Sequence, residues 1–245
     1  MSSARTLATA MRVLAQLRRD PRTVALLLVV PCVLVLLVDQ LFAGRTAVFQ
    51  QVGVPMLGLF PLISMFLVTS ITMLRERVSG TLERLLTTPI RKLDLLLGYG
   101  IAFALVAVVQ ATVVSIVGFG LLDLQTTHSK VVVVLLAVAN ATLGMAFGLF
   151  VSAFAQTEFQ AVQFMPAFVL PQILLCGLFV SRDEMAEWLQ WVSAALPLTY
   201  SFDALDRASH DASLGGRFWA DVGVTLGATV LALVLGAVTL RRRTP

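Results

Sequence analysis

The stretch LLLGYGIAFALVAVVQATVVSIVGFGLL, residues 95–122, contains no charged side chain. About 20 apolar residues are enough for a helix to cross the hydrocarbon core of a bilayer. A single segment in lipid must satisfy its own backbone hydrogen bonds, which a helix does and an isolated strand does not. This stretch therefore predicts a transmembrane helix.

The composition of the whole chain gives the same indication. Apolar residues make up 58% of the 245 residues, against roughly 45–50% in soluble proteins. Charged residues make up 13%, about half the usual share, and the mean hydropathy is +0.90. We expect an integral membrane protein with one domain that extends over residues 1–245.

Six apolar runs are long enough to span a bilayer, and together they predict an all-α fold. The predicted spans are residues 23–42, 52–74, 95–122, 131–154, 161–180 and 222–240.

The basic residues predict the orientation of these spans. With the N-terminus in the cytoplasm, thirteen of the 18 Lys and Arg residues fall in cytoplasmic segments and five fall outside. Membrane proteins show this bias, so we expect both termini in the cytoplasm. The net charge of +4 then reflects membrane orientation, and we expect no nucleic acid partner.

Two amphipathic segments lie outside the spans. In residues 1–20 the pattern predicts an interfacial helix, either a membrane anchor or a lever that contacts a cytoplasmic partner. Asp20 is expected to cap the next helix, with Pro21 at its first position. The apolar face of the interfacial helix comprises Leu7, Met11, Leu14 and Leu17, with Arg12 on the opposite face.

The second amphipathic segment is expected on the outer side, within residues 181–200. Ser181 and Glu184 have the spacing of a capping box, which predicts one helix over residues 181–197. The helix is expected either to lie flat on the membrane or to form a lid over a pathway. Its apolar face includes Met185, Trp188, Leu189 and Val192.

The sequence lacks the motifs of several enzyme classes. It has no phosphate-binding loop of the Gly-x-x-x-x-Gly-Lys-Ser/Thr type, no His/Cys spacing typical of a metal site and no catalytic triad pattern. We therefore expect a non-enzymatic chain without a metal. The predicted spans also lack the central ionisable residue typical of ion-coupled carriers.

Uncharged polar residues do occur within the spans. They are expected either to hydrogen-bond between helices or to line a substrate pathway. The candidates for a pathway are Gln110, Asn140, Gln163 and Gln172.

The charged segment RERVSGTLERLLTTPIRK, residues 75–92, separates the second and third spans. Gly80 is expected to end the preceding helix, and Thr81 to cap a short helix that Pro89 ends. Such a helix would fit a groove on a soluble partner, although a solvated loop is the alternative. Its apolar stripe comprises Leu82, Leu85 and Leu86, with Glu83 and Arg84 on the polar side.

This segment resembles the region between the second and third spans of ABC-2 type transporter permeases. The stretch LPQILLCGLFVSRDEMAEWLQWVSAALPLTYSFDALDR, residues 170–207, resembles the fifth span and outer helices of the same family. The subgroup that it resembles most is the daunorubicin-resistance-like drug exporters of bacterial plasma membranes.

The resemblance implies a role for each segment. Residues 1–20 would form the connecting helix, with Leu7, Met11, Arg12 and Leu14. Residues 80–86 would form the coupling helix, which contacts an ATPase subunit. A polar relay between the two helices would comprise Arg75, Glu76 and Arg77.

The resemblance also implies the partners. A separate ATPase subunit would bind ATP and Mg, and a second permease chain would complete the transporter. The cargo would be an amphipathic small molecule moved out of the cell. The alternatives are a lipid or glycan cargo, or a membrane carrier or scaffold without an ATPase.

Overall fold

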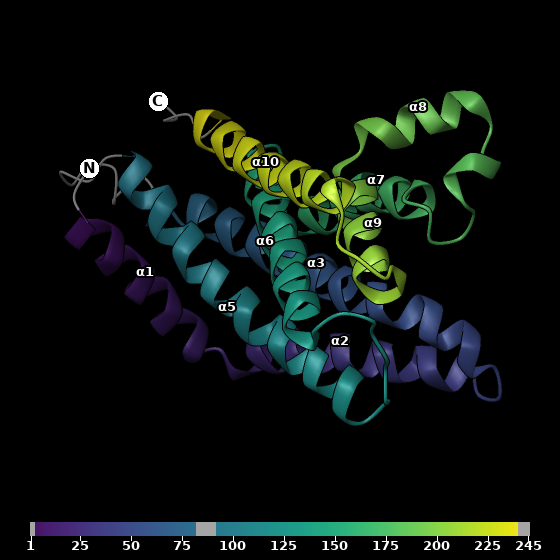
Figure 1. Cartoon of the computed structure of the whole chain (residues 1–245). Coiled ribbons are helices and arrows are strands. Elements are labelled where there is room, and N and C mark those ends of the chain that lie inside the picture. Colours follow the sequence, from purple (N-terminus) through teal and green to yellow (C-terminus); the bar gives the residue numbers. More distant parts are fainter. Residues whose placement is uncertain (1–2, 82–91, 240–245) are drawn as a thin grey trace.

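The computed structural model describes residues 3–81 and 92–239, which form helices and loops without a strand (Figure 1). The helices are α1 (Ser3–Arg18), α2 (Pro21–Leu41), α3 (Thr46–Val78), α5 (Lys92–Gly120), α6 (Lys130–Ser152), α7 (Glu158–Leu175), the short 3₁₀ helix η1 (Arg182–Glu184), α8 (Glu187–Ala195), α9 (Pro197–His210) and α10 (Gly216–Thr239).

Five of the described helices are long and apolar enough to cross a membrane: α2, α3, α5, α6 and α10. The predicted all-α membrane fold is confirmed. The sixth predicted span corresponds to α7, which is not among the five because three glutamines, two prolines and Glu158 interrupt its 18 residues. A count of six spans therefore stays a prediction.

The outer faces of the long helices are apolar. Leu26 on α2, Leu105 on α5 and Val230 on α10 are each at least half exposed, as are further large apolar side chains along the same helices. Monomeric soluble proteins rarely expose such extended apolar surface. The chain is a multi-pass membrane protein.

The core of the bundle is the contact between α3 and α6. Gly144 and Gly148 of α6 lie against the backbone of α3, where an added Cβ would collide with the carbonyl groups of Leu62 and Phe66. The hydroxyl of Thr69 also donates across this contact to the Met145 carbonyl, at 3.2 Å. The Gly144-x-x-x-Gly148 spacing therefore permits the close packing of these two helices.

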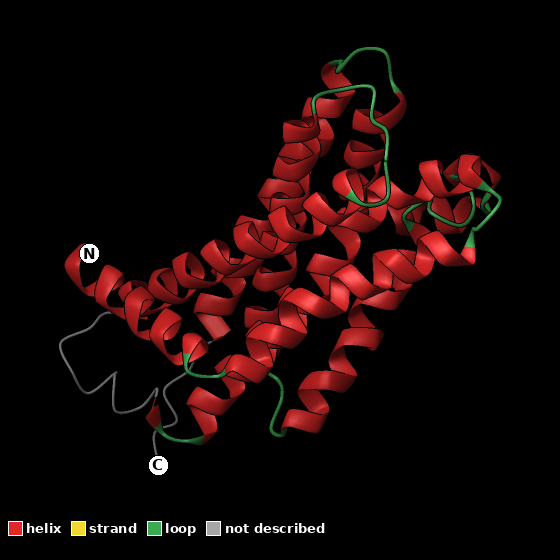
Figure 2. Ribbon diagram, turned by 90° about the horizontal axis from the view of Figure 1, so that it is seen from below, coloured by secondary structure: helices red, strands yellow, loops and turns green. Residues whose placement is uncertain are grey.

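The helices place two groups of residues at opposite ends of the molecule. The first residues of α1 and the last of α10 lie at one end, while the end of α9 and the loop between α5 and α6 lie at the other (Figures 1 and 2). Helix α1 runs alongside α5, and a Cβ added to Gly98 of α5 would collide with Thr9 of α1.

Several boundaries agree with the sequence expectations. Asp20 caps α2 by accepting a hydrogen bond from Thr23 N at 3.2 Å, and Pro21 is the first residue of the helix. Helix α3 is longer at both ends than the predicted span 52–74. Gly80 follows the end of α3 with φ +70, a left-handed conformation that glycine adopts without strain.

Residues 181–197 do not form the single helix that the sequence predicts. Ser181 makes no side-chain cap, so the expected capping box with Glu184 is wrong. Helix α7 already ends at Leu175, short of the predicted residue 180, and Gly177 with φ +101 turns the chain. The η1 turn and α8 follow, separated by Met185 in an extended conformation.

Candidate functional site

Helix α1 joins α3 and α5 through a partly buried polar network. The Arg12 guanidinium donates from Nη1 to Glu76 Oε1 at 3.0 Å and from Nη2 to the Tyr99 hydroxyl at 2.6 Å. Gln16 donates to the same Glu76 oxygen at 3.1 Å. Burial opposes the charged form of Arg12, but Tyr99 and Glu76 outweigh it and raise the pKa of Arg12. The guanidinium of Arg12 therefore keeps its positive charge beside Glu76.

The other connecting-helix candidates divide between two faces of α1. Leu7 and Met11 are 57% and 64% exposed, whereas Leu14 packs against the core. The face of α1 that contacts the protein contains Thr6, Thr9, Ala10 and Val13. Half of the predicted apolar face, Leu7 and Met11, thus points away from the other helices of this chain, while Leu14 and Leu17 are half-buried.

The three relay candidates at the end of α3 contact three different helices. Arg75 pairs with Glu158 at the start of α7, Glu76 pairs with Arg12 of α1, and Arg77 donates to the Ser152 carbonyl of α6. Successive helical residues project about 100° apart, so the sequence Arg-Glu-Arg reaches all three neighbours from one turn. Through its bonds to Arg12 and Gln16, Glu76 joins α3 to α1.

The coupling candidates fall on the border of the described residues. Thr81 lies near the end of α3, where its hydroxyl is 2.9 Å from that of Ser79. Leu82, Glu83, Arg84, Leu85 and Leu86 lie outside the described residues, and their role in contacting an ATPase stays a prediction.

The four pathway candidates have different environments. Gln110 of α5 is buried and donates to the Leu27 carbonyl of α2 at 2.9 Å. This bond fits the alternative expectation, in which the polar residues hydrogen-bond between helices. Gln172 is buried and donates to Phe168 within α7, and Asn140 is buried beside Gly58. Gln163 is exposed on α7. The lining of a pathway by these residues stays a prediction.

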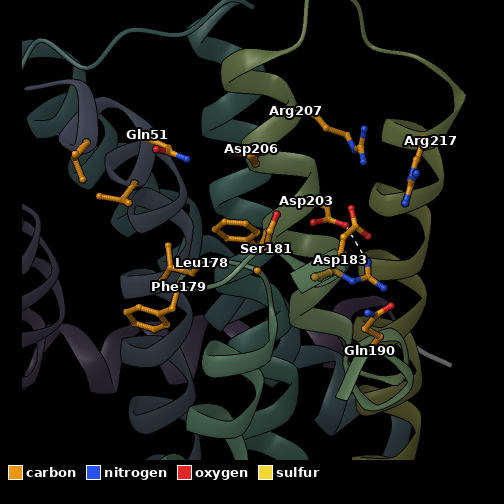
Figure 3. A pocket seen from close by; sticks show the side chains of 15 residues that line it. Gln51, Leu178, Phe179, Ser181, Asp183, Gln190, Asp203, Asp206, Arg207 and Arg217 are labelled. Carbon is orange, nitrogen blue, oxygen red and sulfur yellow. Dashed lines mark hydrogen bonds and ion pairs between the residues drawn. The ribbon is translucent and has the colours of Figure 1, made fainter. Parts of the chain in front are cut away.

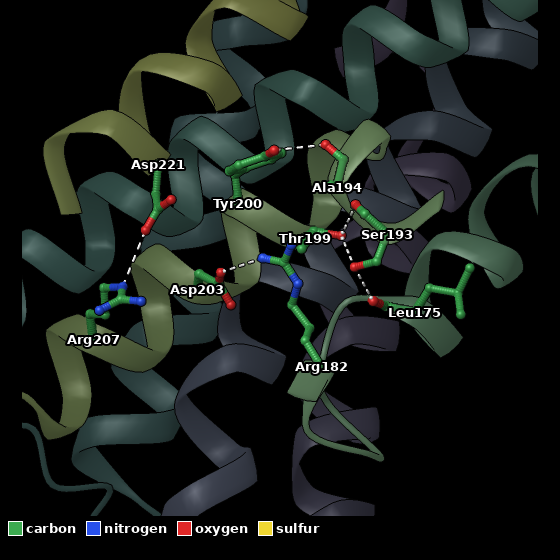
Figure 4. A network of polar contacts seen from close by, with 9 residues as sticks. All are labelled: Leu175, Arg182, Ser193, Ala194, Thr199, Tyr200, Asp203, Arg207 and Asp221. Atoms are coloured by element: carbon green, nitrogen blue, oxygen red, sulfur yellow. Dashed lines mark hydrogen bonds and ion pairs between the residues drawn. The ribbon is translucent and has the colours of Figure 1, made fainter. Parts of the chain in front are cut away.

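At the opposite end of the molecule, two ion pairs connect η1, α9 and α10 (Figure 4). Arg182 pairs with Asp203 at 3.2 Å, and Arg207 pairs with Asp221 at 3.2 Å. Burial raises the pKa of Asp203, and the neighbouring Arg182 only partly offsets this effect.

Hydroxyl groups strengthen the same region. Ser193 donates to the Leu175 carbonyl at 2.8 Å, and Thr199 donates to the Ser193 carbonyl at 2.8 Å. The Tyr200 hydroxyl donates to the Ala194 carbonyl at 2.7 Å. These bonds fix the sharp turn between α8 and α9 against the end of α7 (Figure 4).

A polar cavity of about 610 Å³ lies beside these ion pairs. Side chains of the segment 177–190 face those of α9 and α10 across it, and Gln51 of α3 lines another wall (Figure 3). Its charged lining includes Arg182, Asp203, Arg207 and Arg217. The cavity is open and charged, which suits water or a polar group better than an apolar molecule.

The four lid candidates lie at the edge of this region. Trp188 and Val192 of α8 are 66% and 42% exposed, while Met185 and Leu189 are partly buried. Exposed tryptophan is typical of a membrane interface. A role of these residues as a lid stays a prediction.

The comparisons with known proteins fit this architecture. The family model described as "ABC-2 type transporter" matches residues 5–208, from the first turn of α1 to the last turn of α9. The chain belongs to the ABC-2 type transporter family.

Individual relatives are similar to parts of this ABC-2 chain. "Probable multidrug ABC transporter permease YbhR" of Escherichia coli K12 is 28% identical over 148 residues, covering 60% of this chain and 40% of the relative. "Probable multidrug ABC transporter permease YbhS" of the same strain is 28% identical over 175 residues, covering 70% and 44%. "ABC transporter G family member 20" of Dictyostelium discoideum is 25% identical over 138 residues, covering 56% and 19%. The chain thus matches less than half the length of these relatives.

Sequence reasoning missed Tyr99 and both outer ion pairs. Tyr99 is the one tyrosine within the predicted spans, and a buried tyrosine hydroxyl usually requires a polar partner. That rule could have identified it as part of a network. The outer pairs join residues 14 and 21 positions apart, and no helical spacing indicates such contacts.

Proposed function

We propose that this ABC-2 chain is the membrane subunit of an ATP-driven exporter of amphipathic small molecules. A second permease chain and a separate ATPase subunit would complete the transporter in a bacterial plasma membrane. ATP and Mg would bind to the ATPase, and both termini of this chain would lie in the cytoplasm.

The observation that carries the proposal is the network of Arg12, Glu76 and Tyr99. It joins the interfacial helix α1 to α3 and α5 immediately before the charged segment that follows Thr81. A force applied to that segment by an ATPase would act on the end of α3. Because Glu76 is buried and paired with Arg12, α1 and α3 would then move together.

Two features support an amphipathic cargo. Two of the relatives, YbhR and YbhS, are named as probable multidrug ABC transporter permeases. The polar side chains buried within the membrane-spanning helices of this chain are mostly uncharged, including Gln110 and Asn140. A pathway along such helices would suit a molecule with a large apolar part.

The test is co-purification followed by a transport assay. The tagged chain would be expressed with an ATPase encoded in the same operon, extracted in mild detergent and reconstituted in vesicles. We expect a stable complex whose ATP hydrolysis increases with amphipathic drugs and which accumulates them in inverted vesicles. A chain that binds no ATPase would contradict the exporter and favour a carrier or scaffold. Stimulation by lipids or glycans alone would contradict the cargo class.

A further inference from the structure

Helix α2 contains a proline near its middle, on the face that contacts the rest of the protein. Pro31 is buried together with Leu27 and Val35, which lie one turn before and after it. Proline has no N–H, so the carbonyl four residues earlier, that of Leu27, lacks its usual helical donor. Both residues lie in a helix that is long and apolar enough to cross a membrane, where no water replaces that donor.

A side chain of another helix supplies the missing donor. Gln110 of α5 is fully buried and donates from Nε2 to the Leu27 carbonyl at 2.9 Å. Neighbouring helices often satisfy the backbone groups that a proline frees inside a membrane. In α2 the Gln110 amide does so, at the carbonyl that Pro31 leaves without a partner.

The bond to Leu27 is what the Gln110 amide contributes at this position. Among the described residues no donor reaches its Oε1, which is also buried. Burying an amide is costly, and a leucine side chain of similar size would fill the same space without this cost. The residue type therefore fits a requirement for the N–H group.

Helix α5 binds the chain on both sides of the turn between α1 and α2. The Tyr99 hydroxyl accepts from Arg12 of α1 at 2.6 Å, and Gln110 donates to Leu27 of α2. These two α5 residues lie about 16 Å apart along the helix at 1.5 Å per residue. Helix α1 and the first half of α2 are thus fixed to α5 by two polar contacts, and the second contact lies at the gap in the backbone hydrogen bonds of α2.

We propose that α2 has a joint at Pro31 and that Gln110 is the positioning residue that holds this joint. While Gln110 binds Leu27, the half of α2 next to α1 keeps its angle to the other half. Opening this bond would let that half turn together with α1, and no backbone hydrogen bond breaks at the joint. The proposal rests on the proposed function, in which an ATPase acts on the end of the molecule that contains α1.

The first experiment is a double-mutant cycle on the melting temperature of the purified chain in one detergent, without an ATPase. Gln110→Leu leaves the Leu27 carbonyl without a donor, so we expect a loss of about 2–4 °C. Gln110→Met, also of similar volume, is made alongside it and should show the same loss.

Pro31→Ala restores an N–H for the Leu27 carbonyl. In this background we expect Gln110→Leu to lower the melting temperature by less than about 1 °C. Gln172→Leu is the matched control, because Gln172 is a buried glutamine whose bond to the Phe168 carbonyl stays within α7. It should cost the same in both backgrounds.

The second experiment measures ATP hydrolysis by the complex with the ATPase. Pro31→Ala removes the joint without destabilising the chain, so we expect drug-stimulated hydrolysis to fall at least about threefold. Gln110→Leu releases the joint, and hydrolysis without drug should rise about threefold, as expected for the loss of one hydrogen bond between membrane helices. Leu37→Ala, at an exposed position of the same helix, should leave both rates unchanged. A merely structural role would not move the two rates in opposite directions.

Equal losses from Gln110→Leu in the two backgrounds would overturn the proposal, because the amide would then not replace the missing N–H. Normal stimulation in Pro31→Ala would overturn it as well, since transport would need no joint in α2. Failure of the wild type to bind an ATPase is a different outcome: it overturns the exporter and the use of the joint in transport. The melting temperatures would still decide whether Gln110 compensates for Pro31.

Discussion

At the scale of single residues, burial determines how much each ion pair contributes to stability. Glu76 is 7% exposed in its pair with Arg12, whereas Glu158 is 53% exposed in its pair with Arg75. Removing one partner of a buried pair leaves an uncompensated charge. An exposed pair contributes about 0–1 kcal/mol, because water solvates both charges when it breaks.

We therefore predict that Glu76→Gln destabilises the chain far more than Glu158→Gln. The expected losses are about 2–3 kcal/mol for Glu76→Gln, reduced from the fully buried case because Arg12 is partly exposed, and below about 1 kcal/mol for Glu158→Gln. The measurement is the thermal denaturation of both variants in the same detergent, with the folded protein that remains followed by size-exclusion chromatography. Equal losses of stability would show that the Arg12–Glu76 pair stabilises the chain no more than the Arg75–Glu158 pair.

The exposed pair predicts a dependence on pH. The hydrogen bond from Arg75 lowers the pKa of Glu158 below its ordinary value of 4.5. A carboxyl whose pKa is lower in the folded state stabilises the fold above its unfolded pKa, and this contribution is lost as the pH falls through the folded value.

The wild type should accordingly lose its small advantage over Glu158→Gln when the pH falls from 7 to below 4. Melting temperatures of both proteins across this range provide the measurement. A difference that persists at the lowest pH would mean that the two proteins differ by packing and not by charge.

At the scale of helices, glycine determines how closely α3 and α6 approach. Gly144 lies against the Leu62 carbonyl, while an added Cβ on Gly223 of α10 would meet no described atom within 4 Å. Both residues begin a Gly-x-x-x-Gly spacing. The spacing therefore predicts close packing within this chain for α6 but not for α10.

Gly144→Val tests this difference, with Gly223→Val as the matched control. The first variant forces α6 away from α3 and is expected to cost about 3 kcal/mol, so that little folded protein is recovered. The second is expected to behave like the wild type in yield and melting temperature. Comparable yields for the two variants would contradict the assigned core contact.

The sequence predicted helices well where one physical pattern dominated. Long apolar runs identified α2, α3, α5, α6 and α10, and Asp20 with Pro21 marked the start of α2. The pattern in residues 181–197 satisfied a local capping rule, but Arg182 pairs with Asp203, 21 positions away. Local spacing contains no information about such a contact, which depends on the fold.

Periodicity also left open which face of a helix contacts protein. In α1 the residues that pack against α5 and α3 are the small and polar ones, including Thr9 and Arg12, while Leu7 and Met11 are exposed. In a membrane protein an apolar face can contact lipid as well as protein. The sequence thus predicted the helix but not its contacts.

At the scale of the whole molecule, α3 connects the two polar regions. Its 33 residues extend about 50 Å at 1.5 Å per residue. Gln51 lines the outer cavity near one end, and Glu76 contacts α1 near the other. Pro55 and Pro61 lie in the half nearer the outer cavity, where they remove backbone hydrogen bonds and permit bending. Both polar regions therefore lie along one continuous helix.

This arrangement predicts that changes in the charged segment uncouple the transporter without unfolding it. Leu86→Asp places a charge on the predicted contact with an ATPase, and Glu83→Ala removes a carboxylate from the same predicted contact. We expect both variants to reach the membrane at normal levels. Their drug-stimulated ATP hydrolysis should fall at least about tenfold, which corresponds to a loss of about 1.4 kcal/mol in the interaction with the ATPase. Leu121→Asp makes the same change at an exposed position of the opposite end and should retain normal stimulation. If both variants hydrolyse ATP and export drug like the wild type, the ATPase contact lies elsewhere, and the most accessible alternative is the exposed Leu7 and Met11 face of α1.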